Sequence, residues 1–106
     1  MRSWLFLILA GMFEIGWPLG FKLSQIPEKR ALGIVLAIIC MAVSGYLLWS
    51  AQREIPMGTA YAVWTGIGAA GTFLVGVCFF GDSASVGRYL GAMLIVSGVI
   101  TLKLMH

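Results

Sequence analysis

Glu14 is the residue of this chain best placed to do chemistry, because it is the one acidic side chain inside four long apolar runs. A carboxylate at the centre of a bilayer costs on the order of 3 kcal/mol, and the residues that persist there mark proton relays and ion pathways. A proton and a cation would compete for the same carboxylate oxygens. We therefore expect Glu14 to bind protons and cations in turn.

Helical spacing indicates which side chains could share a site with Glu14. Residues three or four positions apart lie on one helix face, and in the first run that face carries Gly11 and Trp17. The second run offers the hydroxyl of Ser44 and the third run a stripe that begins with Tyr61 and Trp64. We predict that these five residues line the site. Tyrosine and tryptophan also form belts at membrane surfaces, so for Trp17, Tyr61 and Trp64 that second interpretation stays open.

Pro18 changes the backbone next to the carboxylate. A helix normally donates the amide of residue 18 to the carbonyl of residue 14, and proline has no amide hydrogen. The main-chain carbonyl of Glu14 therefore lacks its usual partner. It could meet a cation, a water or a hydroxyl, or neighbouring groups could simply accommodate a kink, as they do in many membrane helices.

The elements that must position these residues are membrane spans. The chain has 106 residues, of which 60% are hydrophobic and 10% charged, and its mean hydropathy is +0.99. A water-soluble fold of this size could not bury so much apolar surface. Each run approaches the length of about 20 residues that crosses a bilayer. We predict an all-α membrane protein with a single four-helix domain over 1–106, whose spans cover about 4–21, 31–50, 59–80 and 89–104.

The basic residues are divided almost evenly between the two membrane surfaces. Four spans place three of them on one side (Arg2, Arg53, Lys103) and four on the other (Lys22, Lys29, Arg30, Arg88). A fixed orientation normally requires an excess of Lys and Arg on the cytoplasmic side. The sequence therefore predicts both orientations and an antiparallel dimer, related to the inverted repeats of larger transporters. One orientation with a parallel or heteromeric assembly is the alternative. The basic residues form no helix face for nucleic acid, so we expect none to bind.

Glycine placement predicts where helices meet or bend. Gly91 and Gly98 lie on one stripe of the fourth run, and small residues allow the close backbone approach that drives helix association in lipid. We predict that they pack the dimer. Gly66 and Gly68, in the middle of the third run, are predicted to form a hinge.

Several functions are not supported by the residue pattern. Glu14 has no His, Asp or metal-ligand cluster beside it in the spans, so we expect neither an enzyme nor a metal or other cofactor. Cys40 and Cys78 lack metal-ligand spacing and are interpreted as structural. The first run is interrupted by Glu14, and no cleavage site of small residues follows it. We therefore expect it to be a span that stays in the protein.

Three segments, spread along the whole chain, resemble sequences of the small multidrug resistance family. They are 11–17 (GMFEIGW), 56–68 (PMGTAYAVWTGIG) and 94–104 (LIVSGVITLKL). Trp17 and Lys103 are similar to the guanidinium-exporter branch of that family, whereas Pro18 replaces the small residue expected after Trp17. The resemblance implies an antiparallel dimer in the bacterial inner membrane that exchanges protons for guanidinium at Glu14. It also implies that Lys103 supports function from near the membrane surface, and it leaves a heterodimer open.

Two other functions stay open at this point. A site built from hydrogen-bonding groups rejects ligands that lack them, whereas a box of aromatic rings tolerates quaternary ammonium ions. Ser44, Tyr61 and the tryptophans favour the selective site, and a broader exporter of quaternary ammonium compounds is the alternative. A structural or regulatory membrane subunit, whose glutamate only bonds a neighbouring helix, belongs to a different class.

Overall fold

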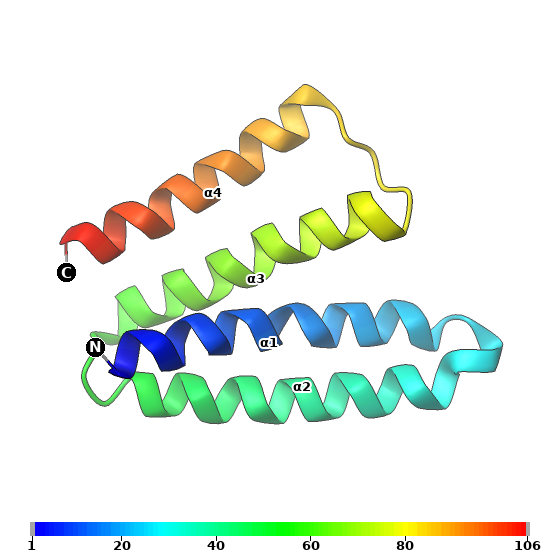
Figure 1. Cartoon of the computed structure of the whole chain (residues 1–106), viewed down its shortest axis with the longest axis horizontal. Helices are drawn as coiled ribbons and strands as arrows, with labels where there is room; N and C mark the ends of the chain where they lie inside the picture. Colours follow the sequence, from blue (N-terminus) through cyan, green and yellow to red (C-terminus); the bar gives the residue numbers. More distant parts are fainter. Residues whose placement is uncertain (1, 106) are drawn as a thin grey trace.

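The computed structural model describes residues 2–105, and this part of the chain is helical apart from its loops (Figure 1). Its elements are α1 (Arg2–Ser24), the short 3-10 turn η1 (Pro27–Lys29), α2 (Arg30–Ala51), α3 (Met57–Phe79) and α4 (Val86–Met105). Four of these helices are long and apolar enough to cross a membrane. The predicted class, an all-α membrane protein with four spans, is confirmed.

The helices extend past the apolar runs from which they were predicted. α1 begins at Arg2 and continues through Lys22 to Ser24, and α4 begins at Val86 and runs through Lys103. Hydropathy marks the part of a helix that lies in hydrocarbon, whereas the helix itself continues into the headgroup region, where long basic side chains reach water. At about 1.5 Å per residue, the 23 residues of α1 span about 35 Å.

Proline and glycine set the ends of the helices. Pro27 begins the 3-10 turn between α1 and α2, and Pro56 directly precedes α3. Proline fixes the backbone and restricts the residue before it, so helices usually end before it and start after it. Gly81 follows α3 with a φ of 71°, the one positive φ among residues 2–105. These short connections make successive spans run in opposite directions (Figure 1).

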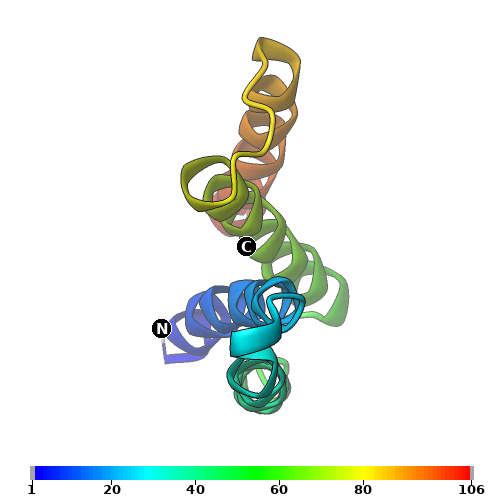
Figure 2. The same cartoon turned by 90° about the vertical axis from the view of Figure 1, so that its right-hand side faces the viewer.

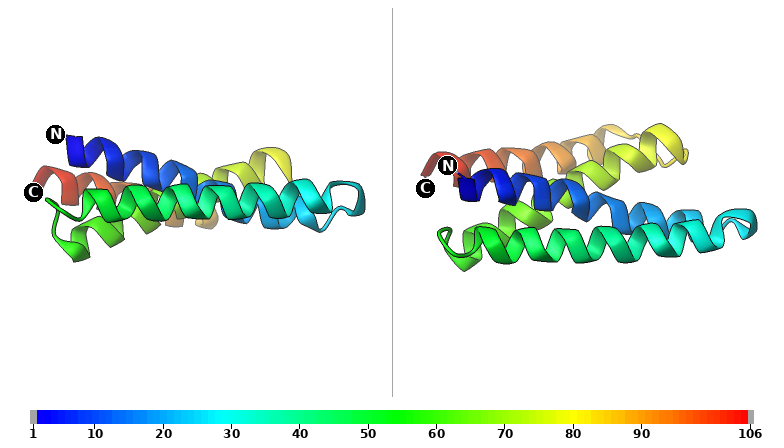
Figure 3. Two further views of the ribbon diagram at one scale, coloured as in Figure 1. Left: turned by 90° about the horizontal axis from the view of Figure 1, so that it is seen from below. Right: turned by 60° about the horizontal axis from the view of Figure 1, so that its bottom comes forward.

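Helices α1 and α2 lie side by side along their length, α3 crosses α1, and α4 packs its backbone against α3 alone (Figures 1 and 2). The further views in Figure 3 show the same layers, with the two chain ends near the connection between α2 and α3. Backbone contact joins α1 to α2. A Cβ atom on Gly20 would meet the carbonyl oxygen of Gly33 at 2.6 Å, so no larger residue fits there.

The buried core is small and lies at the end of the molecule that holds the termini. It contains Leu7 from α1, Ala51 from the end of α2, Ile55 from the loop that follows, and Ala60 and Val63 from α3. No described residue of α4 is buried. Large apolar side chains instead cover the outer surfaces of all four helices. That pattern is expected where lipid replaces water as the solvent.

Candidate functional site

Glu14 faces α3 from the middle of α1. Its side chain is half-buried and packs directly on Gly68, where the Cγ atom of Glu14 fills the space that a Cβ atom would take. Gly68 was predicted as part of a hinge, and α3 is continuous from Met57 to Phe79. In this structure Gly68 brings the backbone of α3 against the carboxylate-bearing side chain. The hinge stays a prediction.

Ser44 connects three helices beside the carboxylate. Its side chain is 0% exposed, its hydroxyl donates to the carbonyl of Ala10 on α1 at 2.7 Å, and it accepts the indole N–H of Trp64 from α3 at 2.7 Å. The side chains of Trp17 and Ser44 also lie beside the Glu14 carboxylate, as possible donors to it. A hydroxyl has one hydrogen, so Ser44 can donate to Ala10 or to Glu14 but not to both at once.

The aromatic residues of the predicted site form two pairs. The ring centroids of Tyr61 and Trp64 are 5.6 Å apart, and those of Trp17 and Phe21 are 5.4 Å apart in an edge-to-face arrangement. Tyr61 is 57% exposed on the single chain. The hydrogen bond to Ser44 holds the Trp64 indole in place. Most of the Tyr61 ring, by contrast, is free to meet lipid, substrate or a second copy of the chain.

Gly11 and Gly66 are contact points between helices. Gly11 was predicted to line the site, and a Cβ atom there would come within 2.7 Å of the Cβ atom of Ile67 on α3. Gly66, the other predicted hinge residue, packs against Val99 on α4. Both glycines bring α3 close to its neighbours. Gly66 also lines a groove between α3 and α4.

The predicted dimer and support residues all lie on α4. Nothing lies within 4 Å of a Cβ atom built on Gly91 or Gly98, so this stripe of α4 is unoccupied by the described chain. Lys103 places its Nζ atom 5.0 Å from the ring centre of Trp4, which joins the end of α4 to the start of α1 by a cation–π contact.

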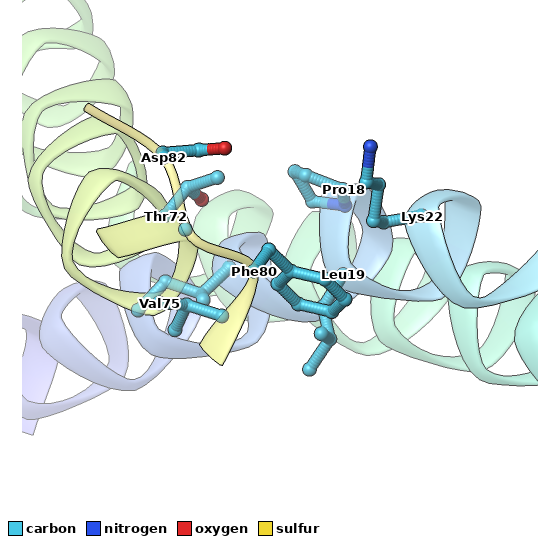
Figure 4. Close-up of a pocket in the computed structure, with 9 residues that line it drawn as sticks. Pro18, Leu19, Lys22, Thr72, Val75, Phe80 and Asp82 are labelled. Atoms are coloured by element: carbon cyan, nitrogen blue, oxygen red, sulfur yellow. The ribbon is translucent and has the colours of Figure 1, made fainter. Parts of the chain in front are cut away.

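A cavity of about 180 Å³ continues the α1–α3 contact beyond Glu14 (Figure 4). Ile15 and Leu19 line it from α1, Thr72 and Val75 from α3, and Pro18 lies at its wall. The charged side chains of Lys22 and Asp82 lie at one edge of it in Figure 4.

The sequence predictions missed Asp82, which follows α3 in a loop. Its side chain packs on Gly76, and its amide donates to the carbonyl of Gly76 at 3.1 Å. A lone carboxylate just after an apolar run was the available signal, but its position against α3 depends on the reversal at Gly81.

Among residues 2–105, no group of three or more His, Cys, Asp or Glu side chains lies together as a metal site would require. Cys40 is buried and adjoins Gly16, whereas Cys78 is exposed. Glu14, the hydroxyl of Ser44 and the indoles of Trp17 and Trp64 are thus the polar groups gathered at mid-span.

Such an arrangement, a carboxylate held at mid-span by polar and aromatic neighbours in a bundle of four spans, is the one expected of a small membrane transporter. The family model described as "Small Multidrug Resistance protein" matches residues 2–95. The chain belongs to this family, and it is a multi-pass protein of the bacterial membrane.

Similar proteins include three that bear the name "Guanidinium exporter". The one from Yersinia pseudotuberculosis is 44% identical over 102 residues, which cover 96% of this chain and 97% of the relative. The one from Citrobacter freundii is 45% identical over 102 residues, 96% of each chain. The one from Salmonella typhimurium strain LT2 is 43% identical over the same share of both chains.

Proposed function

We propose that this protein exports guanidinium or small guanidinyl cations in exchange for protons, and that Glu14 binds each of them in turn. The observation that carries the proposal is the position of Glu14, at mid-span against the α3 backbone and beside the Ser44–Trp64 pair. The names of relatives that are 43–45% identical over 96% of the chain support the substrate.

Competition for one carboxylate is sufficient to couple the two ions. The ionised carboxylate binds the cation, and protonation removes the charge that holds it, so each ligand displaces the other. If the protein changes its open side only when Glu14 is occupied, a proton gradient drives cation export. The membrane potential adds about 2.3 kcal/mol per charge per 100 mV.

The groups around Glu14 match a guanidinium ion. This cation is flat and presents a fork of N–H donors, which suits two parallel hydrogen bonds to a carboxylate and stacking on an aromatic ring. Glu14 supplies the first contact, and Trp17 or Trp64 the second. Gly11 brings the α3 backbone close to the carboxylate, Ser44 fixes Trp64, and Tyr61 completes the wall of the site.

The working form that we propose is an antiparallel dimer in which two Glu14 residues meet. Gly91 and Gly98 form an unoccupied stripe on α4 that fits a second α4, and the seven basic residues divide three to four between the two ends of the molecule. Inversion symmetry makes the two open states equal in energy, as in inverted-repeat transporters. A related but different chain could take the place of the second copy.

A binding titration across pH with Glu14→Gln alongside tests the central claim. Guanidinium should bind the wild-type protein more weakly as the pH falls, because protons fill the same site, and Glu14→Gln should abolish binding. Glu28→Gln, which neutralises an exposed carboxylate in the loop after α1, is the matched control and should bind as the wild type does. Undiminished binding by Glu14→Gln would show that the carboxylate is structural and that the protein is a membrane scaffold or subunit.

The aromatic pairs and the apolar wall of the 180 Å³ cavity support a second candidate, a broader exporter of quaternary ammonium ions. Proteoliposomes loaded with a pH-sensitive dye distinguish the two functions. Guanidinium should move protons and tetraalkylammonium ions should not. Proton movement with the tetraalkylammonium ion alone would replace the first proposal by the second.

A further inference from the structure

A second polar cavity lies at the end of the molecule that holds the termini, far along α1 from the Glu14 region. It has a volume of about 310 Å³ and lies between the start of α1, the end of α2 and the following loop. Arg2 and Arg53 line it together with the hydroxyl-bearing Tyr46 and Ser50 and the carboxylate of Glu54. The function proposed above uses none of these side chains.

The two guanidinium groups have no carboxylate partner among the described residues. Glu54 lines the same cavity but accepts the hydroxyl of the buried Ser3, and neither arginine forms an ion pair with it. Arg53 instead stacks over the ring of Trp49, with its Cζ atom 4.3 Å from the ring centre. Two positive charges therefore face one negative charge, and the cavity keeps an excess of positive charge.

Two exposed aromatic residues fix the depth of this cavity in the membrane. Tyr46 and Trp49 lie on the outer face of α2, 64% and 55% exposed, with ring centroids 6.0 Å apart. Tyrosine and tryptophan concentrate at the level of the lipid headgroups. Because Arg53 follows this pair by one turn, at the end of the span, the cavity lies where lipid phosphates lie.

We propose that this cavity binds the phosphate of an anionic phospholipid. The planar guanidinium fork of arginine matches phosphate oxygens, and the hydroxyls of Tyr46 and Ser50 can donate to the same group. Glu54, bonded to Ser3, is the one described acid in the cavity, and it would disfavour a more highly charged anion. The lipid site is independent of Glu14 and of the transported ion.

The test measures lipid binding to the purified full-length protein by native mass spectrometry. The probes are phosphatidylglycerol, zwitterionic phosphatidylethanolamine and inorganic phosphate. Wild type should retain phosphatidylglycerol in preference to phosphatidylethanolamine, and inorganic phosphate at equal concentration should not displace it. The double variant Arg2→Gln/Arg53→Gln should bind phosphatidylglycerol about 30-fold more weakly, since each arginine near an anionic surface contributes about 1 kcal/mol.

The matched control removes the same charge from the opposite end. Lys29→Gln/Arg30→Gln, at the exposed junction of η1 and α2, should bind phosphatidylglycerol as the wild type does. Tyr46→Phe is a variant with a minimal effect on folding. It should weaken the binding of phosphatidylglycerol about fivefold, because it removes one hydrogen bond of about 1 kcal/mol. All variants should bind guanidinium normally.

Equal lipid retention by Arg2→Gln/Arg53→Gln and its control, or by Tyr46→Phe and wild type, would overturn the proposal. Displacement of the lipid by inorganic phosphate would do the same, because it would identify a site for a free anion.

Discussion

At the scale of single residues, Ser44 has a larger role than its size indicates. Its hydroxyl donates to the Ala10 carbonyl and accepts from the Trp64 indole, so one oxygen atom holds α1, α2 and α3 together at the level of Glu14. The sequence identified Ser44 as a central hydroxyl in the second span. The identity of its partners depends on how three helices pack, which no local pattern shows.

Ser44→Ala should therefore lower both stability and substrate affinity. The change leaves the partly buried indole N–H of Trp64 without a partner, which costs about 1–3 kcal/mol, and it frees Trp64 to leave the site. Thermal unfolding in detergent and guanidinium titration are the measurements. Ser97→Ala, on the exposed surface of α4, is the control. If the two variants behave alike, the three-helix connection has no energetic importance.

Pro18 gives a second prediction at this scale. α1 continues through Pro18 to Ser24, although the Glu14 carbonyl receives no amide from residue 18. Pro18→Ala should restore that hydrogen bond and raise the free energy of unfolding by on the order of 1 kcal/mol. Pro56→Ala, which changes the proline that precedes α3, should give little gain because no helical bond is missing there. An equal rise in melting temperature for both variants would contradict this account.

At the scale of helices, the sequence predicted four spans, because hydrophobicity marks the segments that can lie in hydrocarbon. Side-chain burial was harder to predict. Leu7 and Phe21 lie on the same face of α1 by helical spacing, yet Leu7 is 0% exposed and Phe21 is 48% exposed. α1 packs against different neighbours along its length. Because the faces of a membrane helix differ little in hydrophobicity, the sequence does not show where the neighbour changes. Close contacts such as Gly20 on Gly33 are likewise visible only in the packed structure.

Gly68→Ala tests whether close approach of α3 to α1 shapes the site. The added methyl group would overlap the Cγ atom of Glu14, so α3 or the carboxylate must move. We expect guanidinium affinity to fall at least tenfold, equivalent to about 1.4 kcal/mol, while the helix content by circular dichroism stays unchanged.

Gly45→Ala makes the same chemical change at a position where nothing lies within 4 Å. It should leave affinity unchanged and slightly favour the helix. Equal affinity in the Gly68 and Gly45 variants would show that the contact with Glu14 has no functional effect.

At the scale of the whole molecule, a single copy of the chain leaves most of the surface of α4 uncovered. No described residue of α4 is buried, and nothing in the described chain lies within 4 Å of a Cβ atom at Gly91 or Gly98. Gly98→Leu should therefore weaken dimer formation at least tenfold, because leucine blocks close approach of two α4 backbones. Cross-linking at increasing dilution of the protein in lipid measures the strength of dimer formation. Gly58→Leu, at an open position in the first turn of α3, is the control, and a dimer equally stable in both variants would place the interface elsewhere.

The charge distribution makes a prediction about orientation. Arg2, Arg53 and Lys103 belong to the end that holds the termini, where Lys103 also stacks on Trp4 and the two arginines line the polar cavity. A phosphate site at that end stabilises the protein equally on either membrane surface wherever anionic lipid is present on both. It therefore adds nothing to the three-to-four balance of basic residues, which predicts unbiased insertion.

Ser83→Cys, in the loop between α3 and α4, reports this orientation when Cys40 and Cys78 are replaced by alanine. An impermeant maleimide added to intact cells should label about half of the molecules, because a charge difference of one favours neither insertion strongly. Labelling of lysed cells gives the value for all molecules. Arg88→Gln leaves three basic residues on each side of the membrane, and the labelled fraction should stay near one half. Labelling of all molecules, or of none, would establish a single orientation and exclude the antiparallel dimer, since two copies with one orientation cannot be related by inversion.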